Sequence, residues 1–110
     1  MTGSVINIRA TECAPEQEAK YVKWYEDVHV PMLLKIPEVL RVTRYRFVSG
    51  EKDHPKYLTI YEFADLAAAE RYEKSAEVAA SKEEIKVSWP QGGWEHKWKA
   101  QYEVTKVWEK

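Results

Sequence analysis

Four segments of the chain are rich in β-branched and aromatic residues, and each predicts a β-strand. In the first, Val5 to Ala10, Ile6 and Ile8 lie on one face and Val5 and Asn7 on the other. The third is bulky on both faces, which is typical of a central strand. The last alternates strictly, with one face expected to carry Trp94, His96, Trp98, Ala100, Tyr102 and Val104. We therefore expect strands over residues 5–10, 39–48, 57–63 and 94–104.

Between these segments, apolar side chains recur near the 3.6-residue period of an α-helix. Ala14-Pro15-Glu16 opens the first helix, because proline is favoured in a first turn. Pro31 cannot donate a hydrogen bond to the carbonyl of Asp27, so we expect a kink just after His29 and an end before Pro37. The apolar residues of this helix, which should face the core, are Tyr21, Tyr25, Val28, Met32 and Ile36.

Two capping residues predict the remaining helical stretches. Asp65 suits the N-cap of a second helix, and Ser75 suits the N-cap of a further segment that runs to about residue 87. The order is then βαββαβ, which is the α+β ferredoxin-like arrangement of a four-stranded antiparallel sheet with helices on one face. We expect one domain over residues 1–110. The aromatic residues of the chain give the other face of the sheet a reason to pack against a second copy, as a homodimer.

Composition and charge exclude several classes of partner. Lysine and arginine number 17 and aspartate and glutamate 18, so no basic excess predicts nucleic-acid binding. No apolar run approaches the roughly 18 residues that a bilayer span needs, and we expect neither a membrane partner nor a signal peptide. A single cysteine, Cys13, leaves no internal disulfide and fits a reducing cytoplasm, where we expect the protein to act.

The first helix carries a motif that resembles a known family. Trp24-Tyr25, then His29-Val30-Pro31 and Leu33-Leu34-Lys35-Ile36-Pro37 before a strand, is similar to the first helix of EthD-like proteins of the dimeric α/β-barrel superfamily. The resemblance implies a pocket in each protomer between sheet and helices, and dimerisation through the sheets. Relatives in this superfamily include cofactor-free monooxygenases, lactone isomerases, polyketide cyclases, decarboxylases and haem proteins, and fold alone does not choose among them.

The positions of the histidines indicate which branches of the superfamily the chain resembles more. The methylmuconolactone-isomerase branch has a histidine late in the first helix and another before the third strand, which His29 and His54 match. The olivetolic-acid-cyclase branch relies on a histidine after the second helix, and residues 81–90 contain none. Haem-degrading members use a histidine in the second-helix region, and residues 65–87 contain none. Both of these branches therefore resemble the chain less.

His29 is the candidate acid/base. Burial in an apolar cavity would lower the pKa of an imidazole, so that it serves as a neutral base near pH 7. Tyr25 lies one turn earlier and could hydrogen-bond the imidazole or a substrate. The alternative is a structural histidine that bonds a backbone carbonyl freed by Pro31.

The other candidate residues also each have an interpretation without a functional role. His54 is a candidate catalytic residue in a loop, or an exposed histidine without a role. His96 could enter the pocket or pack between Trp94 and Trp98. Arg44 and Arg46 share a face, where one could bind a carboxylate or enolate oxygen, or they could pair with acids such as Glu62. We expect substrate contacts from Trp24, Arg46, Tyr61 and His96.

No nucleotide or metal cofactor is indicated. The chain has no Gly-x-Gly-x-x-Gly, no phosphate loop and no His-x-x-x-His or Cys-x-x-Cys pair. The sequence favours a small cofactor-free enzyme of the isomerase, cyclase or decarboxylase type, acting by proton transfer on a cyclic, aromatic or lactone-like compound. The alternatives are a non-catalytic small-molecule-binding or accessory protein and a cofactor-independent monooxygenase.

Overall fold

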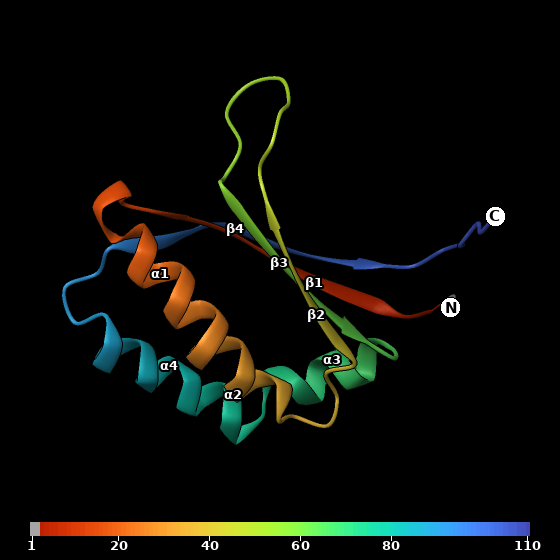
Figure 1. Ribbon diagram of the computed structural model, residues 1–110. Helices are drawn as coiled ribbons and strands as arrows, with labels where there is room; N and C mark the ends of the chain where they lie inside the picture. Colours follow the sequence, from red (N-terminus) through yellow and green to blue (C-terminus); the bar gives the residue numbers. More distant parts are fainter. Residues whose placement is uncertain (1–2) are drawn as a thin grey trace.

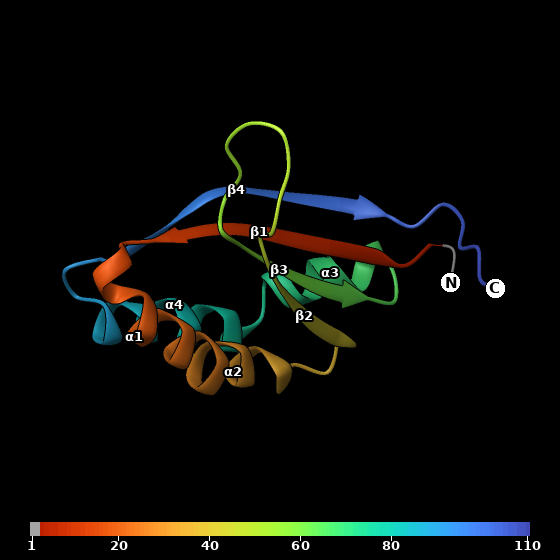
Figure 2. The ribbon, with the colours of Figure 1, turned by 45° about the horizontal axis from the view of Figure 1, so that its top comes forward.

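A computed structural model describes residues 3–110, and it places all helices on one face of a four-stranded antiparallel sheet (Figures 1 and 2). The α+β ferredoxin-like fold is thereby confirmed. The elements, in order, are β1 (Val5–Cys13), a 3₁₀ turn (Pro15–Gln17), α1 (Glu18–Trp24), a π-helical segment (Tyr25–His29), α2 (Val30–Leu34), β2 (Arg41–Arg46), β3 (Tyr57–Phe63), α3 (Leu66–Glu73), α4 (Ala76–Ser88) and β4 (Trp94–Glu103).

The sheet order is β2-β3-β1-β4, so β3 and β1 are central and β4 is an edge strand. β3 has the predicted bounds and position. β1 extends to Cys13, three residues beyond the prediction, because it pairs with β4 along that whole length. β2 is shorter than the predicted 39–48. Val39 instead donates its N–H to the carbonyl of Ile36 (3.0 Å), in the turn that follows α2.

The two faces of the sheet differ in what covers them. On the helix side lie buried residues of β1 and β3 such as Val5, Tyr61 and Phe63, which form one core with Leu33 and Tyr72. The other face, called the open face here, meets no helix (Figure 2). Its residues alternate with the buried ones and include Ile6, Ile8, Thr43, Tyr45, Leu58, Ile60, Trp98, Ala100 and Tyr102.

A β-bulge corrects the predicted faces of β4. Ala10 pairs with Trp98 and Thr11 pairs with His96, so Lys97 is an extra residue opposite β1. One inserted residue moves every later side chain to the other face. Trp94 and His96 therefore turn toward the helices, whereas Trp98, Ala100 and Tyr102 lie on the open face.

A second irregularity lies in the first helix. The break expected just after His29 is a π-helical segment that ends at His29, and the N–H of Val30 donates to the carbonyl of Tyr25, five residues earlier. Pro31 has no N–H to continue the regular α-helical ladder there. The wider turn shifts the inward face by one residue, so His29 and Leu33 are buried in place of the predicted Val28 and Met32.

The predicted helix caps are present. The carboxylate of Asp65 accepts a hydrogen bond from the N–H of Ala68 (2.8 Å). The Ser75 hydroxyl accepts one from the N–H of Val78 (3.2 Å) and donates one to the carbonyl of Tyr72 (2.8 Å). The cap at Ser75 thus ties the start of α4 to the end of α3.

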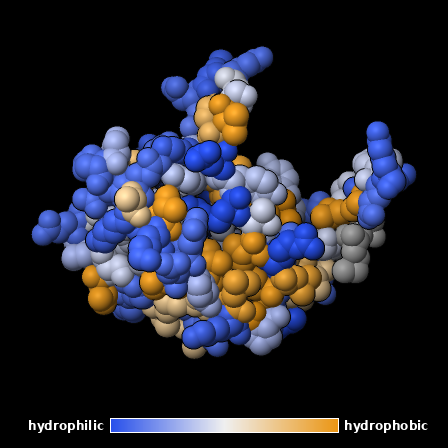
Figure 3. Space-filling view, in the orientation of Figure 1, coloured by the Kyte–Doolittle hydropathy of each residue, from blue (hydrophilic) through white to orange (hydrophobic). Residues whose placement is uncertain are grey.

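The loop between β2 and β3 projects from the open-face side of the sheet, away from the helices (Figures 1 and 2). It carries hydrophobic atoms at its base and hydrophilic ones at its tip (Figure 3). Across residues 3–110, every helix is too short or too polar to span a bilayer.

Candidate functional site

A cavity of about 410 Å³ lies between the sheet and the helices. Its inner wall is aromatic and aliphatic, with Tyr25, His29, Leu33, Tyr61 and Tyr72 among its residues. Four charged residues from β1, α3, α4 and β4 complete the lining: Arg9, Glu73, Lys82 and Lys99. Its volume lies within the range of small-molecule sites.

His29 lies in the wall of this cavity with 8% of its surface exposed. Its Nδ1 is buried without a hydrogen-bond partner, and Nε2 likewise bonds no group of residues 3–110. The pKa of His29 is lowered from 6.5 to about 4, mainly by burial; Glu84 opposes this shift, and His96 and Arg44 contribute to it. The imidazole is therefore neutral at pH 7, and the alternative in which it bonds a carbonyl freed by Pro31 is not what the structure shows.

The π-helical segment explains the position of the ring. A π-helix brings residues five apart onto the same line, and the indole of Trp24 stacks on the imidazole of His29 with centroids 4.9 Å apart and planes at 23°. Trp24 donates its Nε1–H to Glu84 of α4 (2.9 Å), which holds the indole in place. Trp24, predicted as a substrate contact, thus lies behind His29 and supports it.

Tyrosine hydroxyls supply proton donors around the imidazole. The Tyr25 ring meets His29 edge-on at 4.8 Å, and its hydroxyl is buried without a hydrogen-bond partner among the described residues. Burial raises the pKa of Tyr61 well above its ordinary value, and it also raises the pKa of Tyr72. These phenols remain protonated at neutral pH and can donate to an oxyanion.

The Tyr25 ring also contacts a cation. The Arg44 guanidinium lies over the Tyr25 ring, 3.8 Å from its centroid, and donates to Thr59 Oγ1 (2.9 Å). A guanidinium over an aromatic face is attracted by the ring quadrupole. Arg44 was a candidate for substrate or for pairing with Glu62; Glu62 instead lies 3.7 Å from Arg41.

His96 faces the same cavity because it precedes the bulge in β4. Burial lowers the pKa of His96, and the positive charges of Arg9 and Lys99 lower it further. Of the predicted site residues, Tyr25, His29, Tyr61 and His96 thus line the same cavity.

Two predicted site residues lie elsewhere. His54 is exposed in the β2–β3 loop, where its ring stacks on Phe47 at 5.1 Å. Arg46 is exposed beside Lys56 and Tyr57, in a groove lined by α1. Neither lines the cavity that holds His29.

Sequence reasoning missed the charged residues of the cavity. Arg9, Glu73, Lys82 and Lys99 come from four separate elements, and no local spacing relates them. The only signal was the pair of strand positions, Arg9 and Lys99, which become neighbours once the register of β1 and β4 is known. Within residues 3–110, no group of three or more histidine, cysteine, aspartate or glutamate side chains is placed to hold a metal ion.

The family model of DUF4286, a domain of unknown function, matches residues 5–91. The chain belongs to this family. No curated protein matches this DUF4286 chain.

Solved structures share the fold of this DUF4286 chain. An EthD family protein from Bacillus halodurans C-125 is 16% identical, with a TM-score of 0.68 over 92% of this chain and 99% of that one. A dimeric ferredoxin-like protein of unknown function from Jannaschia sp. CCS1 is 15% identical, with a TM-score of 0.65 over 93% and 100%. The heme-degrader MhuD from Mycobacterium tuberculosis, solved with two hemes bound, is 15% identical, with a TM-score of 0.72 over 96% and 99%.

These likenesses confirm the resemblance to EthD-like proteins at the level of fold. At such identities they carry no activity from one chain to another. Proteins of this fold include a heme-degrader and proteins of unknown function.

Proposed function

We propose that this DUF4286 protein is a small enzyme that needs no cofactor and moves a proton on a cyclic, aromatic or lactone-like organic compound, with His29 as the acid/base. One observation carries the proposal: a neutral imidazole without a hydrogen-bond partner lies in the wall of an aromatic cavity. More than nine in ten buried polar groups in proteins are bonded, so an unpaired one indicates a function.

The proposed step is the removal of a proton from a carbon next to a carbonyl group. A ring nitrogen of His29 takes the proton, and the electron pair of the C–H bond moves to the carbonyl oxygen to give an enolate. The Tyr61 or Tyr72 hydroxyl donates a hydrogen bond to that oxygen, since both phenols remain protonated. Returning the proton to another carbon completes an isomerisation, and attack of the enolate carbon on an electrophilic carbon completes a cyclisation. In a decarboxylation the bond to the departing CO2 breaks instead of the C–H bond, its electron pair forms the enolate, and the enolate carbon then takes up a proton.

The low pKa of free His29 suits this step once a ligand is present. An imidazole with a pKa of about 4 is a weak base, but an anion beside it stabilises the imidazolium form. Developing negative charge on the substrate would therefore raise the pKa of His29 during the reaction.

The experiment is a His29→Gln variant assayed on a turned-over substrate found by screening lactones and aromatic keto acids. One positioned base contributes about 10² to 10⁴ in rate, so we expect a loss of that size in kcat with the fold retained by circular dichroism. Full turnover in this variant would remove His29 from the mechanism. The same change at His54 tests the second predicted histidine, which keeps a role only if its loss also slows turnover.

Two alternatives predict other results from the same protein. A non-catalytic binding protein would retain a ligand through purification, visible by native mass spectrometry, and would convert nothing in the screen. A cofactor-independent monooxygenase would consume dioxygen with its substrate, which an oxygen electrode detects.

We further propose a homodimer formed through the open face of the sheet. The solved dimeric protein from Jannaschia has the same fold. Here that face carries large exposed side chains, with Tyr45 at 50%, Trp98 at 45% and Tyr102 at 61% exposure. Burying such residues against a second copy is favourable by about 25 cal/mol for each Å² of apolar surface.

A further inference from the structure

The rim of the His29 cavity carries an excess of positive charge. Of its charged residues, Arg9, Lys82 and Lys99 are cations and Glu73 is the one carboxylate. Burial lowers the pKa of both histidines of the cavity, which favours their neutral forms, so the positive charge of the rim comes from the arginine and the two lysines. One negative group is therefore present for three positive ones, in a protein whose overall charge is close to neutral.

Two of these cations are placed where they repel each other. Arg9 of β1 and Lys99 of β4 are direct partners across the antiparallel pair, and both line the cavity. Like charges directly opposite each other destabilise a sheet. Lys99 and Lys82 form no ion pair with any residue of 3–110, whereas Lys97 and Lys86, their neighbours along the chain, each pair with a glutamate.

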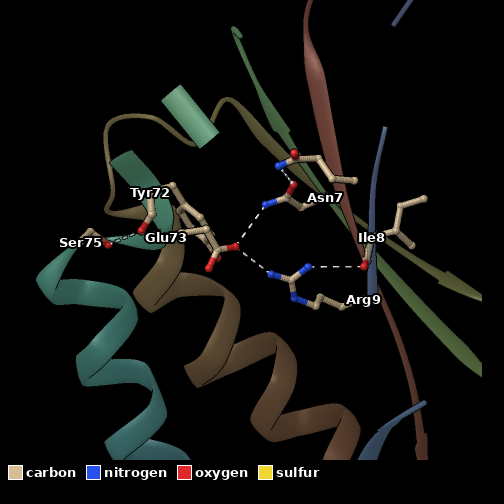
Figure 4. Close-up of polar contacts among 7 residues, drawn as sticks. Asn7, Ile8, Arg9, Tyr72, Glu73 and Ser75 are labelled. Atoms are coloured by element: carbon tan, nitrogen blue, oxygen red, sulfur yellow. Dashed lines mark hydrogen bonds and ion pairs between the residues drawn. The ribbon is translucent and has the colours of Figure 1, made fainter. Parts of the chain in front are cut away.

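Arg9 is fixed in position by a chain of polar contacts (Figure 4). Its Nη2 donates to Glu73 Oε1 (2.9 Å), and Asn7 Nδ2 lies 3.4 Å from the same oxygen. Gln101 in turn donates to Asn7 Oδ1 (2.8 Å). The guanidinium has five N–H groups, so donors remain for a ligand after this contact.

Glu73 is a weak counter-ion for the rim. It is the last residue of α3, where the helix dipole disfavours a carboxylate, and 44% of its side chain is exposed. It neutralises Arg9 alone, which leaves the charges of Lys82 and Lys99 uncompensated.

We propose that the basic rim, defined as Arg9, Lys82 and Lys99, binds the carboxylate group of the ligand while the ligand's ring lies in the aromatic cavity beside His29. A planar carboxylate matches the fork of the Arg9 guanidinium. Placed between the side chains of Arg9 and Lys99, it relieves the repulsion between them. The substrate is then a ring compound that carries a carboxylate, which deepens the proposed function and rests on it only for the step at His29.

The test compares 2-naphthoate with its uncharged isostere 2-naphthamide, by tryptophan fluorescence and isothermal titration calorimetry on the whole chain. Charge-assisted hydrogen bonds to the carboxylate should make naphthoate bind about tenfold more tightly or better. Raising the salt concentration should weaken naphthoate binding and leave naphthamide binding unchanged.

Matched lysine variants locate the effect. Lys99→Gln and Lys82→Gln should each weaken naphthoate binding by about three- to fivefold, a modest effect because both residues are exposed, and should not affect naphthamide. Lys97→Gln and Lys86→Gln remove the same charge from the same two elements, outside the cavity, and should change neither affinity.

The outcome for His29→Gln separates this inference from the proposed function. That variant should lose turnover and keep its preference for naphthoate over naphthamide. Equal affinity for the two probes, no binding of naphthoate at its solubility limit, or equal effects of the rim and control lysines would each overturn the basic rim without touching the role of His29.

Discussion

At residue 29 the chain buries an imidazole and gives neither of its nitrogens a hydrogen bond within the described residues. Leaving a buried polar group unpaired costs about 1 to 3 kcal/mol. Stacking on Trp24 offsets part of that cost, and the Trp24 contact to Glu84 keeps the indole in place. A buried polar group that lowers the stability of the fold in this way is typical of a binding or catalytic site.

The titration of His29 should be visible in both NMR and stability. Burial lowers its pKa from 6.5 to about 4, so the unfolded chain binds a proton that the folded chain does not in this pH range. The free energy of unfolding should therefore fall as the pH drops from about 6.5 to about 4, by up to about 3 kcal/mol. Urea unfolding at several pH values measures this, and the imidazole Cε1–H signal reports the pKa.

The control for this titration is His29→Gln, which should flatten most of the stability change between those pH values. A His29 signal that titrates near 6.5 would contradict the burial that the structure shows.

Some residues of the site could be predicted from the sequence, and others could not. His29 and Tyr25 could be chosen from the sequence because they share one helix with Pro31. Arg9, Glu73 and Lys99 could not, since each gains its role from elements that meet only in the folded chain. His54 carried a family signal, but its loop leads away from the cavity.

At the scale of elements, two single-residue insertions decide which side chains reach the site. The π-helical segment moves His29 and Leu33 inward, and the bulge at Lys97 separates His96 from Trp98. Neither follows from hydrophobic periodicity, because each breaks the period on which the prediction rests. The order of elements, the bounds of β3 and the caps at Asp65 and Ser75 obey regular periods and local hydrogen bonding, so the sequence predicted them.

The half-buried Ser75 cap is expected to contribute measurably to stability. Ser75→Ala removes the bond to the Val78 N–H and the bond to the Tyr72 carbonyl, at a cost of about 1 kcal/mol. For a chain of this size the melting temperature should fall by about 4 °C. Thermal unfolding followed by circular dichroism measures the change.

Ser49→Ala is the control for the cap, since Ser49 is exposed in the β2–β3 loop and forms no hydrogen bond with another described residue. Equal melting temperatures for the Ser75→Ala protein and the unaltered chain would show that α3 and α4 do not depend on this cap.

At the scale of the whole molecule, the helices cover one face of the sheet and leave the other to the proposed second copy (Figure 2). A dimer would be in equilibrium with monomers, so the melting temperature should rise with protein concentration. Tyr45→Glu places a charge on the open face and should shift the protein to monomers in sedimentation-velocity experiments, because a buried unpaired carboxylate is strongly unfavourable.

Val87→Glu is the matched control for self-association. Val87 is 79% exposed on α4, on the helix side of the molecule, and its replacement should not alter the molecular mass in solution. If the unaltered chain sediments as a monomer at every concentration, the proposed dimer is ruled out.

The bulge at Lys97 places nearby side chains of β4 on opposite faces of the sheet. His96 turns toward the helices, whereas Trp98 lies beside Tyr45 on the open face and also borders the cavity, with only one residue between them. A ligand that displaces the backbone at His96 would therefore also displace Trp98, on the face that we propose for self-association. Linked binding equilibria are reciprocal. If the ligand changes the self-association constant by some factor, self-association changes the affinity for the ligand by the same factor. Ligand binding in the cavity and dimer formation through the open face would then be thermodynamically coupled.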